Sequence, residues 1–454
     1  MNTVTAPVPS LSHILRDLRD HPAGSPKRAA DTSAHLLHEL RHIKFVRTDD
    51  VPVRPVVFAT EAYSAYMSAA RRFVELIERA CWWRADSPIE LLSVLQAPPD
   101  AHILLTNNPS EREWASCMSR TDAVVSGGEL KFLECNIGGA IGGVVAMHLL
   151  TGVHRRLMND GTGAPVRFES PFRARLGLYR EACRRLSAPP RVALLGTMRD
   201  DSIQDMRYWK LECDYMGRRG VEAQFVEVED AALHLHASRG PYFPIALRHF
   251  MPQLCVADGM DLSAVMTAQT AGQVMLAPET ATLLENKQIL AWLSEGQPWM
   301  TASDRVFLDR HLPWTRIVAD RAVEFEGGTV RSLPKLLMDR QDAFVIKPVD
   351  QYGGRGVLVG RFAEASDWRE AVEQALSGSR AIVQRYVEPD PLDMTFHRRS
   401  TGDTFTAPVS PVFGFLLMGG TPAGCVVRHA VRNTTGVVNA LRGASINIAG
   451  HGTV

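Results

Sequence analysis

The chain has 454 residues, and its 50 lysine and arginine side chains balance 50 aspartate and glutamate side chains. Net neutrality argues against partners that need a general excess of positive charge, such as nucleic acid or an anionic membrane surface. The sequence is 45% hydrophobic and has seven cysteines without a CxxC pair, and no secretory leader is visible. We therefore expect a cytoplasmic globular protein with reduced thiols, no nucleic-acid partner and no membrane contact.

The N-terminal region, residues 1–115, is predicted to be mostly helical. Between Ser64 and Trp83 the apolar residues recur at the spacing of an amphipathic helix. The breaker-rich stretch 21–26 is expected to separate two shorter helices.

The second region, residues 116–187, begins with a predicted hairpin. Two β-like runs, 122–126 and 130–135, flank a pair of glycines, which favours a tight turn between strands. Two helices are then predicted, at 144–150 and 173–186.

The third region, residues 188–276, alternates strand and helix. A strand at 192–196, a helix at 205–218 and a strand at 221–229 form a βαβ pattern. This pattern predicts a small Rossmann-like parallel sheet.

The last region, residues 277–454, mixes helices and strands. Helices are predicted at 283–293, 303–310 and 368–376, and strands at 344–349, 357–360, 381–387, 413–417 and 425–431. Because residues 389–411 are rich in Pro, Thr, Ser and Asp, a long loop is predicted there.

Four polar residues lie on or near the arms of the predicted hairpin. A turn centred on Gly128 would place Asp122 opposite Glu134 and Arg120 opposite Asn136, all on one face. Two carboxylates and an amide oxygen suit Mg²⁺, which prefers hard oxygen ligands. The alternative is an exposed sheet face whose charges neutralise one another.

A second candidate site combines a lysine with a glycine-rich loop. Lys347 lies in a predicted strand, and Gly353, Gly354 and Gly356 follow it. Glycines allow backbone N–H groups to approach phosphate oxygens, and the lysine adds a positive charge. The alternative is an ordinary hairpin loop, because no GxxxxGK[ST] motif occurs. Lys287 can likewise reach a phosphate from a helix start, or be a solvated surface lysine.

Taken in order, these segments resemble the ATP-grasp ligases, in particular the circularly permuted branch typified by glutathionylspermidine synthetase. The family's Arg-x-Asp and Glu-x-Asn pair matches R-T-D at 120–122 and E-C-N at 134–136. Its Asn-Lys helix start matches 286–287, its lysine and glycine loop 347–356, and its adenine-contacting hinge strand 382–387. The resemblance implies a permuted α+β ATP-grasp fold with Rossmann-like and helical parts.

The resemblance also implies a role for each site residue in an ADP-forming carboxylate–amine ligase with an acyl-phosphate intermediate. Magnesium would be held by Asp122, Glu134 and Asn136, and ATP by Lys287, Lys347, Gly353, Gly354, Gly356, Gln384, Tyr386 and Val387. Arg120 would stabilise the oxyanion of the tetrahedral intermediate. Independently of the resemblance, Arg428 and Arg432 are four apart in a strand-like run and would face the same side, so one of them is expected to contact a phosphate or the acyl phosphate, the alternative being a surface salt bridge.

One departure bears on the substrates. After Glu-x-Asn the amidase-linked synthetases continue with Ala-Asp, whereas this chain has Ile137-Gly138 and no room for an amidase domain. It looks similar to stand-alone permuted ligases of bacterial natural-product clusters, such as the peptide ligase of pheganomycin biosynthesis. Peptide or small-molecule acids and amines are then expected as substrates, in antibiotic biosynthesis. A phosphotransferase and a non-catalytic nucleotide-binding scaffold are the alternatives, and the oligomeric state is open.

Overall fold

A computed structural model describes residue 15 and residues 26–44, 48–158, 165–200, 202–235, 242–431, 435–440 and 443–453. Most of the predicted 21–26 breaker lies outside these residues, and helix α2 (Pro26–Leu40) begins at its last position. Within the described residues no helix is both long and apolar enough to cross a membrane. All seven cysteines are free.

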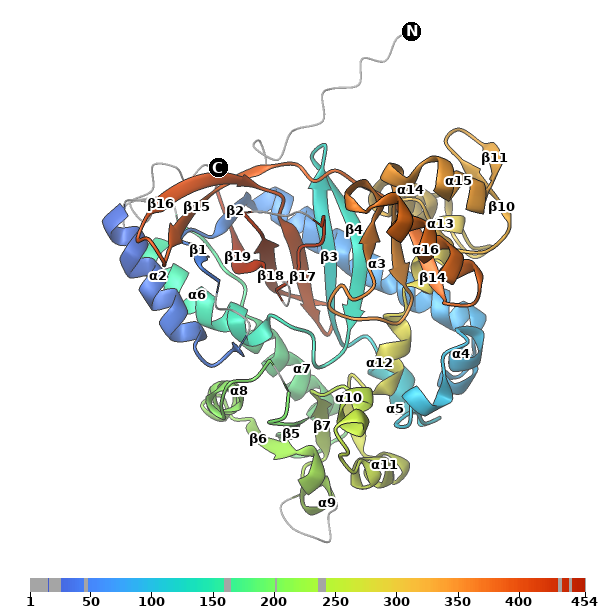
Figure 1. Ribbon diagram of the computed structural model, residues 1–454. Coiled ribbons are helices and arrows are strands. Elements are labelled where there is room, and N and C mark those ends of the chain that lie inside the picture. The colour runs from blue at the N-terminus through green and yellow to red at the C-terminus, as the bar shows by residue number, and fades with distance from the viewer. Residues whose placement is uncertain are drawn as a thin grey trace.

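A six-stranded sheet forms the centre of the molecule (Figure 1). Its strands, in spatial order, are β2 (Val56–Ala59), β19 (Ser445–Gly452), β18 (Thr421–His429), β17 (Val412–Met418), β3 (Met118–Ser126) and β4 (Glu129–Ile137). All neighbours are antiparallel except β2 and β19, which run parallel. The predicted hairpin, β3 and β4, therefore lies at one edge, beside strands from the C-terminal end of the chain.

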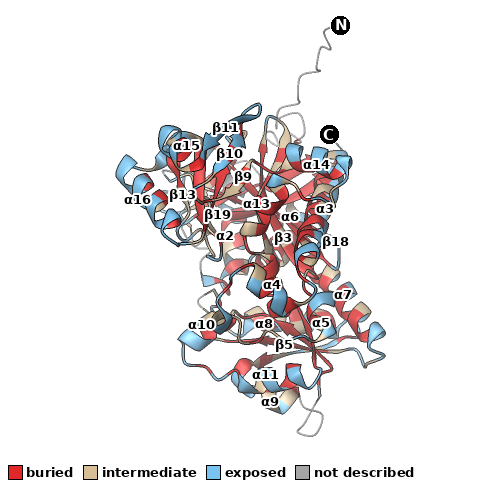
Figure 2. Ribbon diagram, turned by 90° about the vertical axis from the view of Figure 1, so that its right-hand side faces the viewer, coloured by how far each residue is buried: buried red, intermediate tan, exposed pale blue. Residues whose placement is uncertain are grey.

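Helices pack against this sheet and bury its core. They are α3 (Thr60–Arg84), α6 (Val144–Met158) and α7 (Pro171–Arg185). The Phe73 ring of α3 stacks on the Phe132 ring of β4 with centroids 4.3 Å apart, and both side chains are fully buried. Figure 2 shows the central strands in the buried colour and the outer faces of the peripheral helices exposed. The helix predicted for residues 64–83 is confirmed as the middle of α3.

The predicted βαβ unit forms part of a four-stranded parallel sheet. Its order is β6 (Glu222–Glu227), β5 (Arg191–Gly196), β7 (Ile245–Arg248) and β8 (Val274–Leu276), with α8 (Arg207–Gly217), α9 (Ala231–His234), α10 (Pro252–Ala257) and α11 (Ser263–Thr270) around it. A fully buried Arg175 in α7 donates to Glu212 in α8 over 2.7 Å, and Tyr179 donates to the same carboxylate over 2.7 Å. This ion pair ties the parallel sheet to the helices of the central sheet.

An antiparallel four-stranded sheet carries the lysine and the glycine loop. Its order is β13 (Leu358–Val359), β12 (Phe344–Pro348), β14 (Ala381–Arg385) and β9 (Thr315–Ile317), and the helices α15 (Leu333–Asp339) and α16 (Ala365–Leu376) belong to the same lobe. Smaller elements include α4 (Pro88–Val94), α5 (Pro109–Glu113), α14 (Ala302–His311), and the hairpin β10 (Ala322–Phe325) and β11 (Thr329–Ser332). Separate parallel and antiparallel sheets with flanking helices confirm the α+β class.

The single helix predicted at 283–293 is wrong. The chain forms two helices, α12 (Glu279–Leu284) and α13 (Gln288–Glu295). The Asn286 side chain accepts from the Gln288 backbone N–H, and the Lys287 N–H donates to the Val349 carbonyl. These bonds replace helical ones, as local side-chain caps can, so Lys287 lies at the start of α13.

The long loop predicted at 389–411 is also wrong. Strands β15 (Leu392–Arg398) and β16 (Thr404–Val409) pair there, and β1 (Asp50–Pro52) joins them from the N-terminal region. Three consecutive residues of β15, Met394, Thr395 and Phe396, are buried, because the strand is covered on both sides instead of facing solvent as a loop would. The Pro, Thr, Ser and Asp content of the segment therefore misled the prediction.

Candidate functional site

Asp122 faces Glu134 and Arg120 faces Asn136 across the hairpin, as predicted, but the turn alone does not produce this pairing. Gly127 and Gly128 form a two-residue turn with φ of 58° and 77°, which only glycine adopts readily. Such a turn is centred between the two glycines, and it pairs Ala123 with Phe132. An irregularity then skips Leu133, so that Asp122 faces Glu134 as predicted.

This β-bulge decides which side chains reach the site. In a regular strand the side chains of Phe132 and Glu134 would point to the same face. The extra residue, Leu133, lets Phe132 enter the core under α3 while Glu134 lies opposite Asp122 on the other face. The Leu133 carbonyl accepts a hydrogen bond from Lys347, 3.0 Å away.

Asp122 is the most heavily bonded group of the site. Arg120 donates to both of its oxygens, through Nε at 2.8 Å and through a terminal nitrogen at 3.0 Å. Asn136 donates to Oδ2 over 3.0 Å, and an Arg428 terminal nitrogen lies 2.8 Å from the same oxygen. Gly414 on β17 lies opposite Asp122, and a Cβ there would come within 2.8 Å of the Arg120 side chain. The bare backbone at Gly414 therefore makes room for the Arg120–Asp122 pair.

The two arginines keep Asp122 ionised. Its side chain is only 2% exposed, and burial alone would raise the pKa of the carboxyl. Arg120 and Arg428 outweigh this effect and hold the pKa well below its usual range. The negative charge of Asp122 is thus permanent and locally compensated.

Lys347 reaches the hairpin from the antiparallel sheet. Its ammonium donates to Gln384 Oε1 over 2.7 Å and to the Leu133 carbonyl over 3.0 Å. Burial lowers the pKa of Lys347 to about 8, because desolvation outweighs the attraction of Glu134 and Asp122. A larger fraction of Lys347 is therefore neutral than of an exposed lysine, and a bound anion would favour the protonated form again.

Lys287 approaches from the break between α12 and α13. Its Nζ donates to the Gln351 carbonyl of the glycine loop over 2.8 Å and lies 3.7 Å from Glu134 Oε2. The lysine side chain is nine-tenths buried, unlike a solvated surface lysine. The surface alternative for Lys287 is therefore excluded by its position.

A cavity of about 340 Å³ lies between the central sheet and the antiparallel sheet. Asp122, Glu134 and Arg428 line it from one side, and Lys347 and Gln384 from the other. The remaining wall is largely apolar and includes Val124, Val345, Val357, Val359, Phe362, Tyr386, Val387, Val412, Val431, Val437 and Val438. A cavity with an apolar section and a strongly charged end suits a ligand that joins a flat base to an anionic chain.

The glycine loop lies at the charged end of this cavity. Gly353, Gly354 and Gly356 have φ of 63°, 74° and 67°, a region that favours glycine. Gly354 lines the cavity, and a Cβ on Gly356 would come within 2.7 Å of Pro348. The loop thus needs glycine for its backbone path and for its packing.

Most of the predicted site residues are brought together. Those that meet around the cavity or its charged end are Arg120, Asp122, Glu134, Asn136, Lys287, Lys347, Gly354, Gln384, Tyr386, Val387 and Arg428. Gly353 and Gly356 shape the loop beside them. Tyr386 and Val387 follow β14 instead of lying within it. Arg432 lies outside the described residues, so the choice between the two arginines rests on Arg428 alone.

Sequence reasoning missed Glu285, which directly precedes Asn286 and Lys287. Its carboxylate accepts from the Ile137 N–H over 3.2 Å at the end of β4. Burial raises the pKa of Glu285 to about 7. The one sequence feature that could have pointed to Glu285 is its position directly before Asn286 and Lys287.

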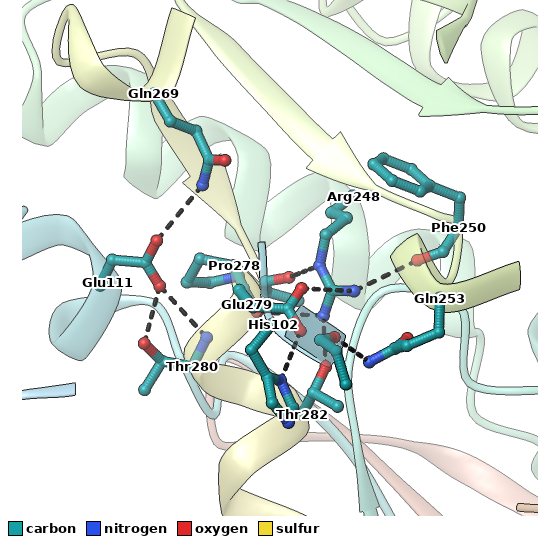
Figure 3. Close-up of polar contacts among 12 residues, drawn as sticks. His102, Glu111, Arg248, Phe250, Gln253, Gln269, Pro278, Glu279, Thr280 and Thr282 are labelled. Atoms are coloured by element: carbon teal, nitrogen blue, oxygen red, sulfur yellow. Dashed lines mark hydrogen bonds and ion pairs between the residues drawn. The ribbon is translucent and has the colours of Figure 1, made fainter. Parts of the chain in front are cut away.

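A buried polar cluster holds the segment that leads to Glu285 (Figure 3). The Arg248 guanidinium at the end of β7 donates to the Ala277 carbonyl over 2.9 Å and to the Pro278 carbonyl over 3.0 Å. Glu279 lies 3.7 Å from Arg248 and 2.9 Å from His102. These contacts anchor α12 to the parallel sheet and so position the 285–287 break.

The donor set fits a hard divalent cation only in part. Among the described residues the Glu134 carboxylate makes one ion pair, with Lys287 at 3.7 Å, and no hydrogen bond, so both of its oxygens can serve as ligands. Asn136 donates with its nitrogen to Asp122, which leaves its amide oxygen for a cation. The Oδ2 atom of Asp122 contacts three side chains, so it can bind a cation only if one of them moves away, and within the described structure Oδ1 accepts from Arg120 alone. In the described ranges no group of three or more His, Cys, Asp or Glu side chains is arranged to hold a metal ion, at this site or at any other.

No protein-family model matches the sequence, and the search of curated proteins gives no match. Among solved structures, the fold is similar to that of a glutathione synthetase-like effector from Globodera pallida in its apo form. The identity is 12%, the TM-score is 0.57, and the match covers 95% of this chain and 98% of that chain. A putative gamma-glutamylcysteine synthetase from Methylobacillus flagellatus matches at 12% identity over 80% and 86% of the two chains, with a TM-score of 0.40 that supports no argument. The predicted α+β fold is thus supported by a solved structure of similar fold, and the permuted order within the ATP-grasp ligases stays a prediction.

Proposed function

We propose that this protein is an ATP-dependent carboxylate–amine ligase that forms an amide or peptide bond and releases ADP. The observation that carries the proposal is the charged end of the cavity. There the buried cations Lys287, Lys347 and Arg428 face the carboxylates Asp122 and Glu134. Such an arrangement stabilises a polyphosphate and the charge that develops when its terminal phosphoryl group is transferred.

The nucleotide would lie with its base between the valines of the two sheets and its phosphates against Lys347, Lys287 and the glycine loop. The substrate carboxylate attacks the γ-phosphate and forms an acyl phosphate. An amine then attacks the acyl carbon, and inorganic phosphate leaves. A Mg²⁺ ion, held by Glu134 and Asn136 and by a released Asp122, would neutralise phosphate charge.

Arg120 has the geometry to support the second step. Its Nε and one terminal nitrogen bind Asp122, and the other terminal nitrogen donates to the Gly142 carbonyl over 2.7 Å. One hydrogen on each terminal nitrogen is left over, since a guanidinium carries five N–H groups. We assign these hydrogens to the oxyanion of the tetrahedral intermediate.

The narrower assignment is a stand-alone peptide ligase of the permuted ATP-grasp branch, active in secondary metabolism. The order of motifs along the chain supports it, because the hairpin that would bind metal precedes Lys287 and Lys347. Peptide or amino-acid acids and amines are the proposed substrates.

The test measures ADP release with Mg-ATP over a panel of amino acids and peptides, with mass detection of new amides. A ligase gives an amide in equal amount to ADP and needs an amine. A phosphorylated acid as the stable product would identify a phosphotransferase, and ATP binding without ADP under any pair would identify a scaffold. Lys347→Met should lose turnover, and Lys335→Met on the exposed face of α15 is the matched control.

A further inference from the structure

Arg428 and Arg120 hold Asp122 in different ways. Arg120 is fixed at three points, since it binds both Asp122 oxygens and the Gly142 carbonyl. Arg428 is fixed at one, through a single terminal nitrogen 2.8 Å from Oδ2. Moving Arg428 away from Asp122 therefore breaks fewer contacts than moving Arg120.

Arg428 is also short of a partner. Its side chain is 8% exposed, and its Nε is buried without a hydrogen-bond acceptor in the described structure. A buried unpaired N–H is costly, more so on a charged group. Arg428 lines the cavity, and a guanidinium that moves onto an anion bound there can bring the unpaired nitrogen to an acceptor.

The Oδ2 atom of Asp122 is saturated in this arrangement. It accepts from Arg120 and Asn136 and forms an ion pair with Arg428, whereas a carboxylate oxygen offers about two acceptor positions. In the described chain Oδ1 accepts only from Arg120 Nε, but a cation at either oxygen would meet the positive charges of both arginines. Asp122 is therefore a poor metal ligand while Arg428 stays in place.

We propose that Arg428 is a positioning residue that closes Asp122 to divalent cations until an anionic group in the cavity draws the guanidinium away. This inference rests on the proposed nucleotide site, whose phosphate chain supplies the anion. Binding of the phosphate chain and binding of the cation by the hairpin are then coupled through one side chain that serves either Asp122 or the phosphate. By reciprocity, a cation on Asp122 favours the phosphate-bound position of Arg428.

The test is the affinity of the nucleotide-free protein for Mn²⁺, followed by the loss of the free-ion signal in electron paramagnetic resonance. Arg428→Gln removes the guanidinium and its charge, so we expect Mn²⁺ to bind at least about tenfold more tightly than to the wild type, the effect of one charge-assisted contact. Arg428→Lys keeps the charge and should gain less. Arg398→Gln, which breaks a similar arginine–carboxylate pair with Asp50, should change nothing.

A second substitution locates the gain. In the double variant Arg428→Gln with Asp122→Asn the added Mn²⁺ affinity should disappear, and a gain that persists would overturn the proposal. Equal Mn²⁺ affinities for wild type and Arg428→Gln would overturn it as well. If Arg428→Gln does not fold, wild-type Mn²⁺ affinity is compared in sulfate and in chloride at equal ionic strength. Sulfate, a small tetrahedral anion, should raise the affinity, and no rise refutes the idea.

The two proposals fail separately. The Mn²⁺ measurement needs neither nucleotide nor turnover, so it stays readable if no substrate pair ever yields ADP. An active ligase whose Arg428→Gln variant shows no gain in Mn²⁺ affinity would keep the proposed function and lose the role of Arg428.

Discussion

Nucleotide binding should take up protons through Lys347, and the amount should depend on pH in a defined way. Burial lowers the pKa of this lysine to about 8 from its ordinary 10.5. In the unliganded protein, about a tenth of the Lys347 side chains are neutral at pH 7, about half at pH 8 and about nine-tenths at pH 9. A phosphate beside the ammonium favours the charged form and raises the pKa again. Binding should therefore take up about 0.1, 0.5 and 0.9 protons at the three values of pH.

The measurement is isothermal titration calorimetry with a non-hydrolysable ATP analogue, in two buffers of different ionisation enthalpy at each pH. Nucleotide phosphates are fully ionised at pH 8–9, so they contribute little to the uptake there. Lys347→Arg is the matched control, because arginine stays protonated at every pH and its uptake should be near zero. Uptake that does not grow with pH, or that is equal in the arginine variant, would show that Lys347 does not meet a phosphate.

The lowered pKa of Lys347 also determines how the stability of the fold changes with pH. The folded protein binds fewer protons than the unfolded chain between about pH 8 and 10.5, so the contribution of Lys347 to stability rises over that range. Near pH 7 the charged buried lysine costs about 3 kcal/mol, at about 1.4 kcal/mol for each unit of pKa. A bound phosphate would offset much of this unfavourable free energy, so the burial of the charged Lys347 should increase the affinity for the nucleotide.

Three further substitutions test the site and its support. Glu134→Gln should lower ADP formation by about 100-fold or more while the melting temperature stays unchanged, since the side chain is half-buried and only loosely paired. Gly139→Ala should lower the free energy of unfolding by about 2–3 kcal/mol in urea, because its Cβ would lie 2.0 Å from a backbone carbonyl of the parallel sheet, whereas Gly138→Ala meets open space and should be nearly neutral. Arg175→Met should cost about 3–5 kcal/mol by leaving the Glu212 carboxylate buried without its cation, and an unchanged urea midpoint would contradict this.

The charged half of the site was predictable because it depends on spacing within short segments. Arg120, Asp122, Glu134 and Asn136 lie close in sequence, so the prediction paired them correctly, although the observed pairing also needs a bulge. The bulge at Leu133 was not predictable. It arises because Phe132 is drawn into the core by Phe73, a residue some sixty positions earlier in the chain.

Contacts between distant segments account for the other errors. The helix break at 285–287 depends on the Val349 carbonyl, and β15 is fixed by pairing with β1 from the N-terminal region. Glu285 belongs to the same class, since only the fold brings it to the end of β4. A local sequence pattern cannot predict such contacts, because the partner strand or carbonyl lies far away in the sequence.

The balance of 50 positive and 50 negative side chains acquires a local meaning in this site. Asp122 is paired with two arginines, and Glu134 has only a distant lysine, so the part of the hairpin that lines the cavity carries one satisfied and one open carboxylate. A hairpin with both carboxylates open would attract cations without any nucleotide, and one with both closed would never bind metal. Because Asp122 is paired and Glu134 is open, the hairpin can have either one or two free carboxylates. Moving Arg428 onto an anion would free Asp122. If Arg428 moves as proposed, cation binding at the hairpin depends on the anion.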